Sequence, residues 1–150
     1  MKFELITPDQ ALTVIDDELF DRISDDYTTI ENLVLHKNHL YIGAFDPDLI
    51  GFARMHPENR TTMTIHINIP EKHRDRAKLM PELFFAEMKS GAAPEVQKFI
   101  CKIPVIYPEV YNFAKFAGFE DEGLDKKSIM KGGKLIDRYI MGLQRGNIHG

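Results

Sequence analysis

The clearest pattern of apolar and polar positions runs over 61–69. The two kinds of residue alternate there, which is the period-two pattern of a strand with one buried face. Pro70 ends the alternation, and the polar, mostly basic stretch 71–78 follows it. Apolar residues then recur at three- and four-residue steps, which predicts a helix, and Pro81 is tolerated only in its first turn. The sequence therefore predicts a strand, a basic loop and a helix that begins no earlier than about Ala77.

The same two periodicities predict the other elements. Thr7, Pro8 and Gln10 form the capping-box pattern of a helix start, and apolar residues continue at helical steps to about Ser24. Further helices are expected at 29–35 and 108–117, and further strands at 2–6, 39–45, 49–55, 96–103, 119–124 and 136–143. Short turns join most neighbouring strands, so these strands should pair antiparallel.

A helix separates the strand 61–69 from the strand 96–103, and a connection of this kind places two strands parallel in one sheet. The expected fold class is therefore α/β. The sheet should be mixed, with an antiparallel N-terminal meander, a parallel crossover after the central strand and helices on both faces. At 150 residues we expect a single domain over 1–150, with 145–150 as a flexible tail.

Composition changes this picture through the distribution of charge. The net charge of −4 argues against nucleic acid as a partner. Residues 1–26 hold eight carboxylates against two basic residues, whereas 71–78 hold four lysines and arginines against two carboxylates. A basic patch before a helix N-terminus, where unpaired N–H groups favour anions, suits a small anion such as phosphate. Arg74, Arg76 and Lys78 are therefore candidate phosphate ligands, and the alternative is a solvated charged loop.

Cysteine and histidine usage narrows the classes of site. Cys101 is the only cysteine, so no internal disulfide or multi-cysteine metal site can form. It lies on a predicted strand, where we expect a core residue rather than a nucleophile. The histidines are scattered without the spacing of a metal site, so we expect no metal. No apolar run reaches the ~20 residues of a membrane span and no signal-peptide pattern is present, so we expect a cytoplasmic protein without membrane partners.

Two stretches of the chain resemble a known family. Residues 74–79, Arg-Asp-Arg-Ala-Lys-Leu, can be laid on the Arg/Gln-x-x-Gly-x-Gly/Ala pyrophosphate loop of the GCN5-related N-acetyltransferases (GNAT). The C-terminal pattern resembles the signature of ribosomal-protein-type N-acetyltransferases, and its residues are Gly118, Phe119, Glu122, Gly123, Gly133, Asp137 and Leu143. The amino-acid sequence of these stretches is also similar to that of small acetyltransferase-like proteins of tailed phages.

The resemblance implies acetyl-CoA as cosubstrate and a primary amine as acceptor. The pantetheine arm would lie between the central strand and the strand that ends near Ile103. The residues that bind the cofactor would be Ile67, Ile69, Arg74, Arg76, Ala77 and Lys78. Arg74 matches the charged position of the family loop. The chain departs from the family where Ala77 and Leu79 replace two glycines that let the backbone approach the pyrophosphate closely.

His66 and Tyr111 are the candidate catalytic residues. His66 lies on the polar face of the central strand, about where the family places a general base, and an imidazole with a pKa of about 6.5 can take a proton from an ammonium. The alternative is a histidine that only packs and hydrogen-bonds. In many family members a tyrosine protonates the leaving thiolate; Ala114 stands at that position, and Tyr111 is the nearest substitute. Tyr107 flanks the same helix, and Glu122 is a weaker alternative base.

Two hypotheses from different classes follow. In the first, the chain binds acetyl-CoA and transfers the acetyl group to a primary amine by direct attack, without a covalent enzyme intermediate. In the second, the fold is retained by a non-catalytic phage protein that acts in virion or head assembly or binds another protein. The replaced glycines and Ala114 favour the second. A homodimer and phage assembly proteins are further partners to consider, and a phage-encoded chain would act in the host cytoplasm.

Overall fold

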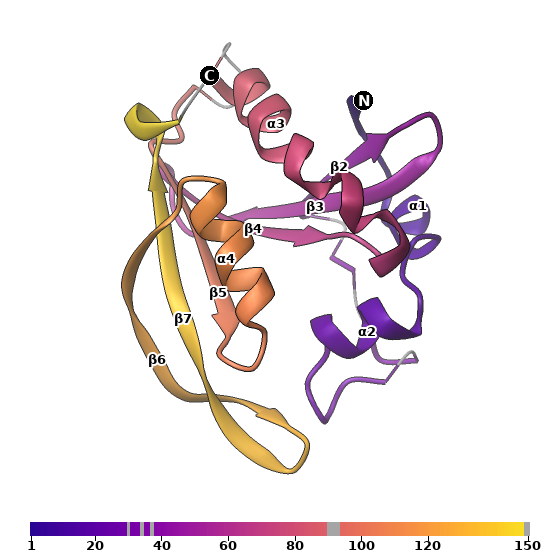
Figure 1. Cartoon of the computed structure of the whole chain (residues 1–150), viewed down its shortest axis with the longest axis vertical. Coiled ribbons are helices and arrows are strands. Elements are labelled where there is room, and N and C mark those ends of the chain that lie inside the picture. Colours follow the sequence, from indigo (N-terminus) through magenta and orange to yellow (C-terminus); the bar gives the residue numbers. More distant parts are fainter. Residues whose placement is uncertain (30, 34, 37, 90–93, 149–150) are drawn as a thin grey trace. The chain divides into compact units, whose positions relative to one another are not determined.

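The structure, a computed structural model, describes residues 1–29, 31–33, 35–36, 38–89 and 94–148 (Figure 1). The chain forms two compact units. The first comprises Met1–His56 and Ile65–Met80, and the second comprises Pro57–Thr64 and Pro81–Gly150. The single domain over 1–150 stays a prediction.

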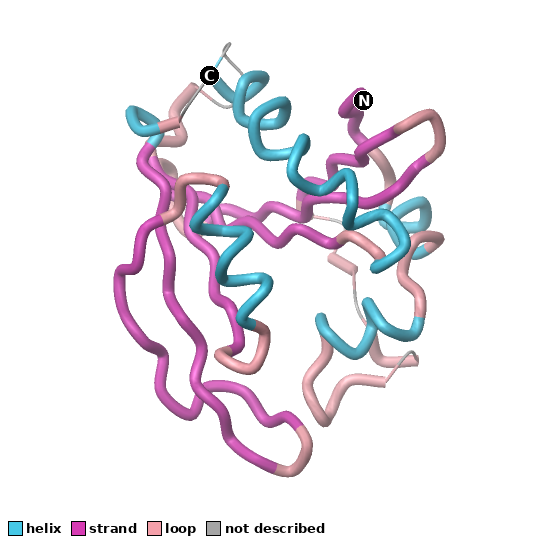
Figure 2. Tube along the Cα trace, viewed as in Figure 1, coloured by secondary structure: helices cyan, strands magenta, loops and turns pink. Residues whose placement is uncertain are grey.

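The first unit is built on an antiparallel meander, drawn in magenta in Figure 2. Its strands are β1 (Lys2–Leu5), β2 (Leu40–Phe45) and β3 (Leu49–Pro57). β2 pairs antiparallel with both β1 and β3, as the short turns predict. Tyr41 of β2 and Phe52 of β3 are buried with Ala11 in a small core. Residues 50–53 of β3 are all buried, so both faces of this strand are covered.

Two short helices follow β1, whereas the sequence predicts one long helix to about residue 24. They are α1 (Pro8–Leu12) and α2 (Asp17–Ile23). The predicted capping box is present: Gln10 Oε1 accepts from the Thr7 N–H at 2.8 Å, and Thr7 Oγ1 accepts from the Gln10 N–H at 3.2 Å. The long helix is nevertheless interrupted because the Asp16 carboxylate accepts a backbone N–H of α2 at 2.9 Å and caps a new helix.

The helix predicted at 29–35 is not formed at the described positions of that range. Residues 31 and 32 form a turn, and 29, 33 and 35 have irregular backbone. The Asn32 side chain accepts the Thr29 N–H at 2.6 Å, and Thr29 Oγ1 accepts the Asn32 N–H at 3.2 Å. Such local side-chain bonds offer the backbone an alternative to the helix. Ile30 and Val34 of this prediction lie outside the described residues.

The basic stretch after the central strand is helical, whereas the sequence predicts a loop. The central strand is β4 (Thr62–Asn68), and the 3₁₀-helix η1 (Glu71–Leu79) leads directly into α3 (Met80–Lys89). The His73 N–H donates to the Pro70 carbonyl at 2.9 Å, and the Met80 N–H donates to the Ala77 carbonyl. The α-helix itself begins after Ala77 with Pro81 in its first turn, as predicted. The stretch before it is therefore an ordered helix of tighter pitch.

The second unit carries a long antiparallel hairpin, drawn in orange and yellow in Figure 1. After α3 the unit contains β5 (Lys98–Pro104), α4 (Pro108–Phe116), β6 (Glu120–Lys131), β7 (Lys134–Gln144) and the 3₁₀-helix η2 (Arg145–Asn147). β6 and β7 form the hairpin. β7 pairs antiparallel with both β5 and β6. Gly132 and Gly133 have φ of 60° and 75°, values that glycine adopts without strain, so they close the hairpin where the sequence predicts a turn. β6 extends beyond the predicted range because Ile129, Met130 and Lys131 pair with β7 again after a register shift that follows Asp125.

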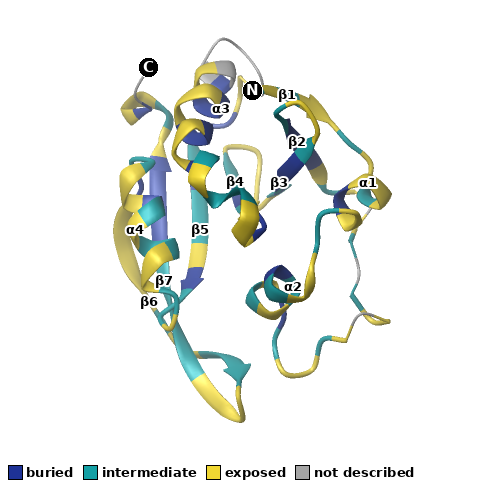
Figure 3. Ribbon diagram, turned by 45° about the vertical axis from the view of Figure 1, so that its right-hand side comes forward, coloured by how far each residue is buried: buried dark blue, intermediate teal, exposed yellow. Residues whose placement is uncertain are grey.

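Apolar side chains of β5, β7 and α3 form the core of the second unit. Phe99 is 1% exposed and Met141 is 0% exposed, and Phe85 meets Phe99 edge to face with ring centroids 5.5 Å apart. Figure 3 shows the buried part of β7 in dark blue and the exposed tip of the hairpin in yellow. The hairpin is therefore anchored at the end that is far from its turn.

The strand order is β1-β2-β3-β4-β5-β7-β6. The β4 residues 62–64 pair with the β5 residues 98–100 in parallel, as the intervening helix predicts. The mixed α/β sheet is thereby confirmed. Among the described residues, none of the helices has the length and hydropathy that a membrane crossing needs.

The segment expected to be a flexible tail is packed as far as it is described. The Arg145 guanidinium donates to the carbonyls of Val96 and Met88 at 3.1 and 2.6 Å. Ile148 is 5% exposed. An arginine fork that satisfies two carbonyls, together with a buried isoleucine, holds this segment against its unit. Residues 149–150 of the predicted tail lie outside the described residues.

Candidate functional site

The central strand has polar residues that are buried as deeply as its apolar ones. Thr64 and Asn68 are 7% and 5% exposed, whereas Ile67, expected on the buried face, is 42% exposed. The Thr64 hydroxyl donates to the Glu58 carboxylate at 2.5 Å, and the Asn68 amide donates to the His66 carbonyl at 3.2 Å. These bonds allow polar side chains to be buried. The alternation predicts the strand correctly, but it does not predict which face is covered.

Four histidines that the sequence shows as scattered lie in one row. The rings of His36 and His39 have centroids 4.7 Å apart, those of His39 and His56 4.6 Å, and those of His56 and His66 5.6 Å. The last two pairs are stacked with interplanar angles of 20°. The row arises because neighbouring strands bring distant residues together, which spacing along the chain cannot reveal. His66, the candidate base, is the end member of this row.

The environment of His39 favours neutral imidazole. Burial lowers the pKa of His39, and the charges of His56, Arg54 and His36 lower it further. Its Nδ1 atom is buried without a hydrogen-bond partner. Stacked rings turn their faces, not their nitrogen lone pairs, toward one another. Within the described residues, no group of three or more His, Cys, Asp and Glu side chains is arranged to hold a metal ion.

Arg74, the best candidate for a phosphate ligand, makes two internal contacts. Its Nη2 donates to the Glu18 carboxylate of α2 at 2.7 Å, and its Nε donates to the Ile69 carbonyl at 3.2 Å. Glu18 also pairs with Arg22 at 2.5 Å. Burial raises the pKa of Glu18, but the hydrogen bonds and charges of the two arginines outweigh it, so that the pKa lies below its ordinary value. Arg74 thus ties the start of η1 to α2 and to the end of the central strand.

Arg76 is held in a similar way by a different part of the unit. Its Nη1 donates to the Asp46 carbonyl at 2.8 Å and to the Asp46 carboxylate at 3.2 Å. Its Nη2 lies 2.6 Å from His73 Nδ1. Burial and the charges of Arg76 and Lys72 lower the pKa of His73, which suits an imidazole that accepts from a guanidinium. Arg76 therefore fastens η1 to the turn between β2 and β3.

The two positions at which the family has glycine differ in their surroundings. Ala77 is 7% exposed, and Ile69, which follows the central strand, is also 7% exposed. Leu79 is 55% exposed, and Lys78 between them is exposed. The Ala77 side chain is therefore accommodated inside the unit, while the bulk of Leu79 lies at the surface.

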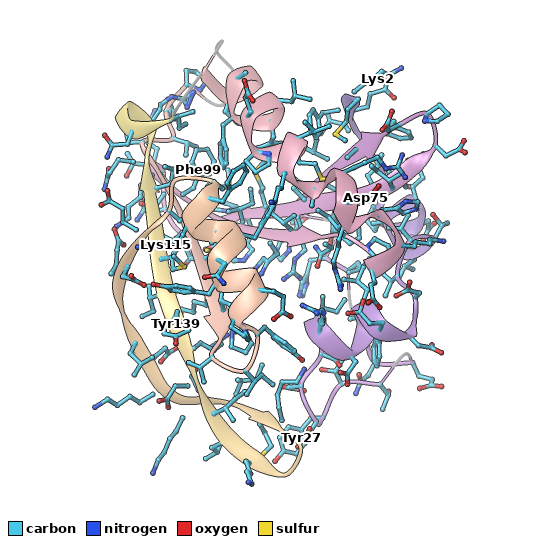
Figure 4. All side chains as sticks on the ribbon, viewed as in Figure 1. Lys2, Tyr27, Asp75, Phe99, Lys115 and Tyr139 are labelled. Atoms are coloured by element: carbon cyan, nitrogen blue, oxygen red, sulfur yellow. The ribbon has the colours of Figure 1, made fainter. Side chains whose placement is uncertain are left out.

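The second candidate catalytic residue belongs to the second unit. The Tyr111 hydroxyl donates to the Asp121 carboxylate at 2.8 Å, and Lys115 Nζ donates to the same carboxylate oxygen at 3.2 Å. The hydrogen bond to Asp121 raises the pKa of Tyr111. The ring lies 4.7 Å from that of Tyr139; Figure 4 labels Lys115 and Tyr139 on α4 and β7. The Tyr111 hydroxyl hydrogen is therefore already engaged in a hydrogen bond to a carboxylate.

The other residues weighed as chemical groups have structural contacts. Glu122 pairs with Lys98 at 2.6 Å, and Lys131 Nζ lies 5.2 Å from the centre of the Tyr107 ring. Burial raises the pKa of Cys101 to about 12, so the thiol stays protonated at neutral pH. The expectation that Cys101 is not a nucleophile agrees with this environment.

The candidate residues fall into two groups. His66, Ile67, Ile69 and the η1 residues belong to the first unit, and Tyr111 belongs to the second. Sequence reasoning missed the partners Glu18 and Asp46, which lie 56 and 30 residues from the arginines that they hold. The excess of carboxylates in 1–26 was a signal that some basic side chains would be neutralised internally. It did not specify which ones.

No protein-family model and no curated protein matches the chain. Solved structures match nearly all of it. A spermidine N-acetyltransferase from Vibrio cholerae in complex with CoA and spermine has a TM-score of 0.76 at 13% identity, covering 97% of this chain and 96% of its own. A ribosomal-protein-alanine N-acetyltransferase from Brucella melitensis reaches 0.73 at 16%, covering 96% and 99%. An acetyltransferase of the GNAT family from Streptococcus pneumoniae reaches 0.67 at 15%, covering 95% and 99%. The chain therefore has the fold of these acetyltransferases.

Proposed function

We propose that the protein binds acetyl-CoA and transfers the acetyl group to a primary amine. The observation that carries this proposal is the match of nearly the whole chain to N-acetyltransferases, one of them in complex with CoA and spermine. The binding of CoA would depend on one part of the fold, in which η1 and α3 lie between β4 and the parallel strand β5. We place this activity in the cytoplasm, or in the host cytoplasm if a phage encodes the chain.

In this proposal CoA lies along β4 and η1. Ile67 and Ile69 border the pantetheine arm, and the exposed side chain of Ile67 is available to an apolar ligand segment. The pyrophosphate lies against η1, near Arg74, Arg76, Ala77 and Lys78. A nearby anion gains from the positive end of a helix and from adjacent cations, so this segment is the natural place for the phosphates. The proposed reaction does not require a metal.

The reaction that we propose is direct aminolysis of the thioester. The amine nitrogen forms a bond to the acetyl carbon, the carbon–sulfur bond breaks, and CoA leaves as a thiolate that takes up a proton. His66 accepts the proton that the attacking ammonium loses, directly or through water. Tyr111 is the proposed donor to the thiolate, and its hydrogen bond to Asp121 would first have to be exchanged. Most of the rate enhancement would come from positioning the two reactants.

A second function is favoured by the contacts of η1. Arg74 and Arg76 are engaged with carboxylates, and backbone N–H groups at both ends of η1 donate to carbonyls. A segment in this state offers fewer donors to a pyrophosphate than an open loop does. The alternative is therefore a non-catalytic protein with this fold that acts in phage virion or head assembly or binds another protein. Self-association to a homodimer is compatible with either function.

Thermal unfolding with and without CoA separates the two functions. A ligand at one hundred times its dissociation constant stabilises the folded state by roughly 2.7 kcal/mol, which for a chain of this size raises Tm by several degrees. We expect CoA and acetyl-CoA to raise Tm, and pantetheine, which lacks the phosphates, to raise it less. An unchanged Tm at millimolar CoA would rule out the enzyme and leave the binding protein.

Catalysis is tested by release of the CoA thiol with a panel of amines that includes a polyamine and a lysine peptide. His66→Gln should reduce kcat and leave the CoA affinity measured by thermal unfolding unchanged, since the base acts on the amine. His36→Gln, at the far end of the histidine row, is the matched control. Equal rates for the wild type and His66→Gln would remove His66 from the mechanism.

A further inference from the structure

The pitch of η1 sorts its charged residues into two sets. A 3₁₀-helix has about three residues per turn, so residues three apart share a ridge. Lys72, Asp75 and Lys78 form one ridge, and all three are exposed. Figure 4 labels Asp75 on this ridge. The arginines lie on the other two ridges, where Arg74 is followed by the buried Ala77, and both guanidinium groups are only partly exposed.

The two arginines are already bound on the inner side of the helix. The exposed fraction of the side chain is 28% for Arg74 and 30% for Arg76, and each has a carboxylate within ion-pair distance. A phosphate that recruited Arg74 would weaken its pair with Glu18, a carboxylate that is itself 35% exposed. Breaking a partly buried ion pair leaves a charge poorly solvated. This cost would be subtracted from any gain that the arginine made with the ligand.

Two backbone donors of the segment are already engaged inside the helix. The His73 N–H in the first turn of η1 donates to the Pro70 carbonyl, and the Met80 N–H that follows the last turn donates to the Ala77 carbonyl. These two N–H groups are therefore used within the helix. The cations on the outer ridge can meet an anion without breaking the ion pairs of the arginines.

We propose that Lys72 and Lys78 make the cationic contacts to the phosphates of CoA, while Arg74 and Arg76 are positioning residues that fasten η1 to α2 and to the β2–β3 turn. This inference rests on the proposed function. Six residues at the 3₁₀ rise of 2 Å separate the two lysines by about 12 Å. Two flexible lysine side chains can span such a distance to reach one pyrophosphate group. Asp75 between them reduces the net charge of the ridge, so its removal should strengthen binding.

The test measures the dissociation constant of CoA and the ligand-free Tm for a matched set of full-length variants. Lys72→Gln/Lys78→Gln should raise the dissociation constant about tenfold and leave Tm unchanged, because both lysines lie at the surface. Arg74→Gln should lower Tm by about 2 °C or more. Asp75→Asn should tighten CoA binding. Lys126→Gln, an exposed lysine of the second unit, is the control for a change of overall charge.

Two further measurements separate phosphate contacts from general effects. Binding of pantetheine should be the same for the wild type and the double lysine variant. Raising the salt concentration should weaken CoA binding to the wild type more than to the double variant, because salt screens exposed charges. Glu18→Gln and Asp46→Asn release the arginines without removing them, and they should lower Tm without tightening CoA binding. These two variants also serve if Arg74→Gln does not fold.

The outcomes distinguish this inference from the proposed function. If the wild type binds CoA, an unchanged dissociation constant for the double lysine variant overturns the inference and leaves the function standing. Tighter CoA binding by Glu18→Gln overturns it as well, since it would identify Arg74 as a phosphate ligand held in reserve. If the wild type does not bind CoA, the proposed function and the lysine contacts fail together. The positioning role of the arginines is then judged by Tm alone.

Discussion

Two ion pairs, one in each unit, use charged side chains in different ways. In the first unit, Arg74 and Glu18 are 56 residues apart in the chain, and their side chains are 28% and 35% exposed. In the second unit, Lys115 and Asp121 are six residues apart, and their side chains are 46% and 50% exposed. Partial burial strengthens an ion pair, whereas exposure and salt screening weaken it. The first ion pair therefore joins two segments that are distant in the sequence. The second joins two neighbouring segments at the surface.

Two glycines, one in each unit, also differ in their surroundings. A Cβ atom at Gly51 in the first unit would lie 2.8 Å from the Asn68 carbonyl oxygen, which belongs to the backbone of the central strand. At Gly142 in the second unit it would meet the Glu122 carboxyl group, which lies at the end of a flexible side chain. A side chain can move aside more easily than a strand. The backbone of the central strand therefore leaves less room for a side chain at Gly51 than the Glu122 side chain leaves at Gly142.

The largest expected effect comes from Gly51→Ala. Forcing a methyl group against the backbone of the central strand should lower the free energy of unfolding by about 1–3 kcal/mol, and Tm should fall by several degrees. Thermal unfolding measures it. Gly142→Ala is the control and should cost less, because the Glu122 carboxyl group can shift at the expense of its pair with Lys98. Equal losses of Tm would contradict the difference between the two glycine positions.

The next effect is that of Glu18→Gln. The folded-state pKa of Glu18 lies below its ordinary value, so its contribution to stability is present above the unfolded-state pKa and is lost as the pH falls through the folded-state pKa. Because the side chain is about one-third exposed, we expect a loss below about 1 kcal/mol at neutral pH. The Tm difference between wild type and variant should shrink below about pH 4. A difference that persists at acid pH would mean that the ion pairs are not its cause.

His39→Asn should change the pH dependence of stability by a smaller amount. Burial lowers the pKa of folded His39, so the unfolded chain binds the proton more readily and stability decreases as the pH falls below about 6.5. Removing the imidazole should remove this part of the decrease. Tm measured between about pH 7.5 and pH 5 should therefore fall less steeply in the variant. A steeper fall would show that His39 stabilises the protein when it is charged.

The smallest effect on stability is expected for Asp121→Asn in the second unit. The hydrogen bond to Asp121 raises the pKa of Tyr111, and an amide would not favour the protonated phenol in the same way. The pKa of Tyr111 should move down toward its ordinary value, which absorbance near 295 nm follows during an alkaline titration, with Tyr111→Phe to assign the signal. Tm should not change measurably. A clear fall of Tm would show that this exposed network carries as much stability as the partly buried one.

Local sequence signals predicted most of the elements correctly. The capping box at Thr7, the turn at Gly132 and Gly133, and the period of the central strand depend on neighbours in the chain, and each is found in the structure. The helix predicted to continue through Asp16 failed for a local reason as well. Asp16 has both a helix-compatible spacing and a capping side chain, and the second property prevailed.

The candidate site was less predictable than the fold. The sequence identified the basic segment and its position before a helix, but not that the segment would wind as a 3₁₀-helix with its arginines turned inward. A change from a loop to three residues per turn alters which side chains share a surface. The row from His36 to His66 was also hidden, because the rings belong to segments that only sheet formation makes adjacent.

By itself, the sequence determined the strands, the parallel crossover and the presence of a basic segment between the central strand and the helix. These features follow from periodicity, proline and glycine, whose effects act over a few residues. Only the tertiary structure decided which cations face solvent. Arg74 and Arg76 were committed to Glu18 and Asp46 by contacts across 56 and 30 residues, and Lys72 and Lys78 were left at the surface. The physical reason is that a partly buried charge is stabilised by an opposite charge that lies close to it in space, wherever that residue lies in the chain.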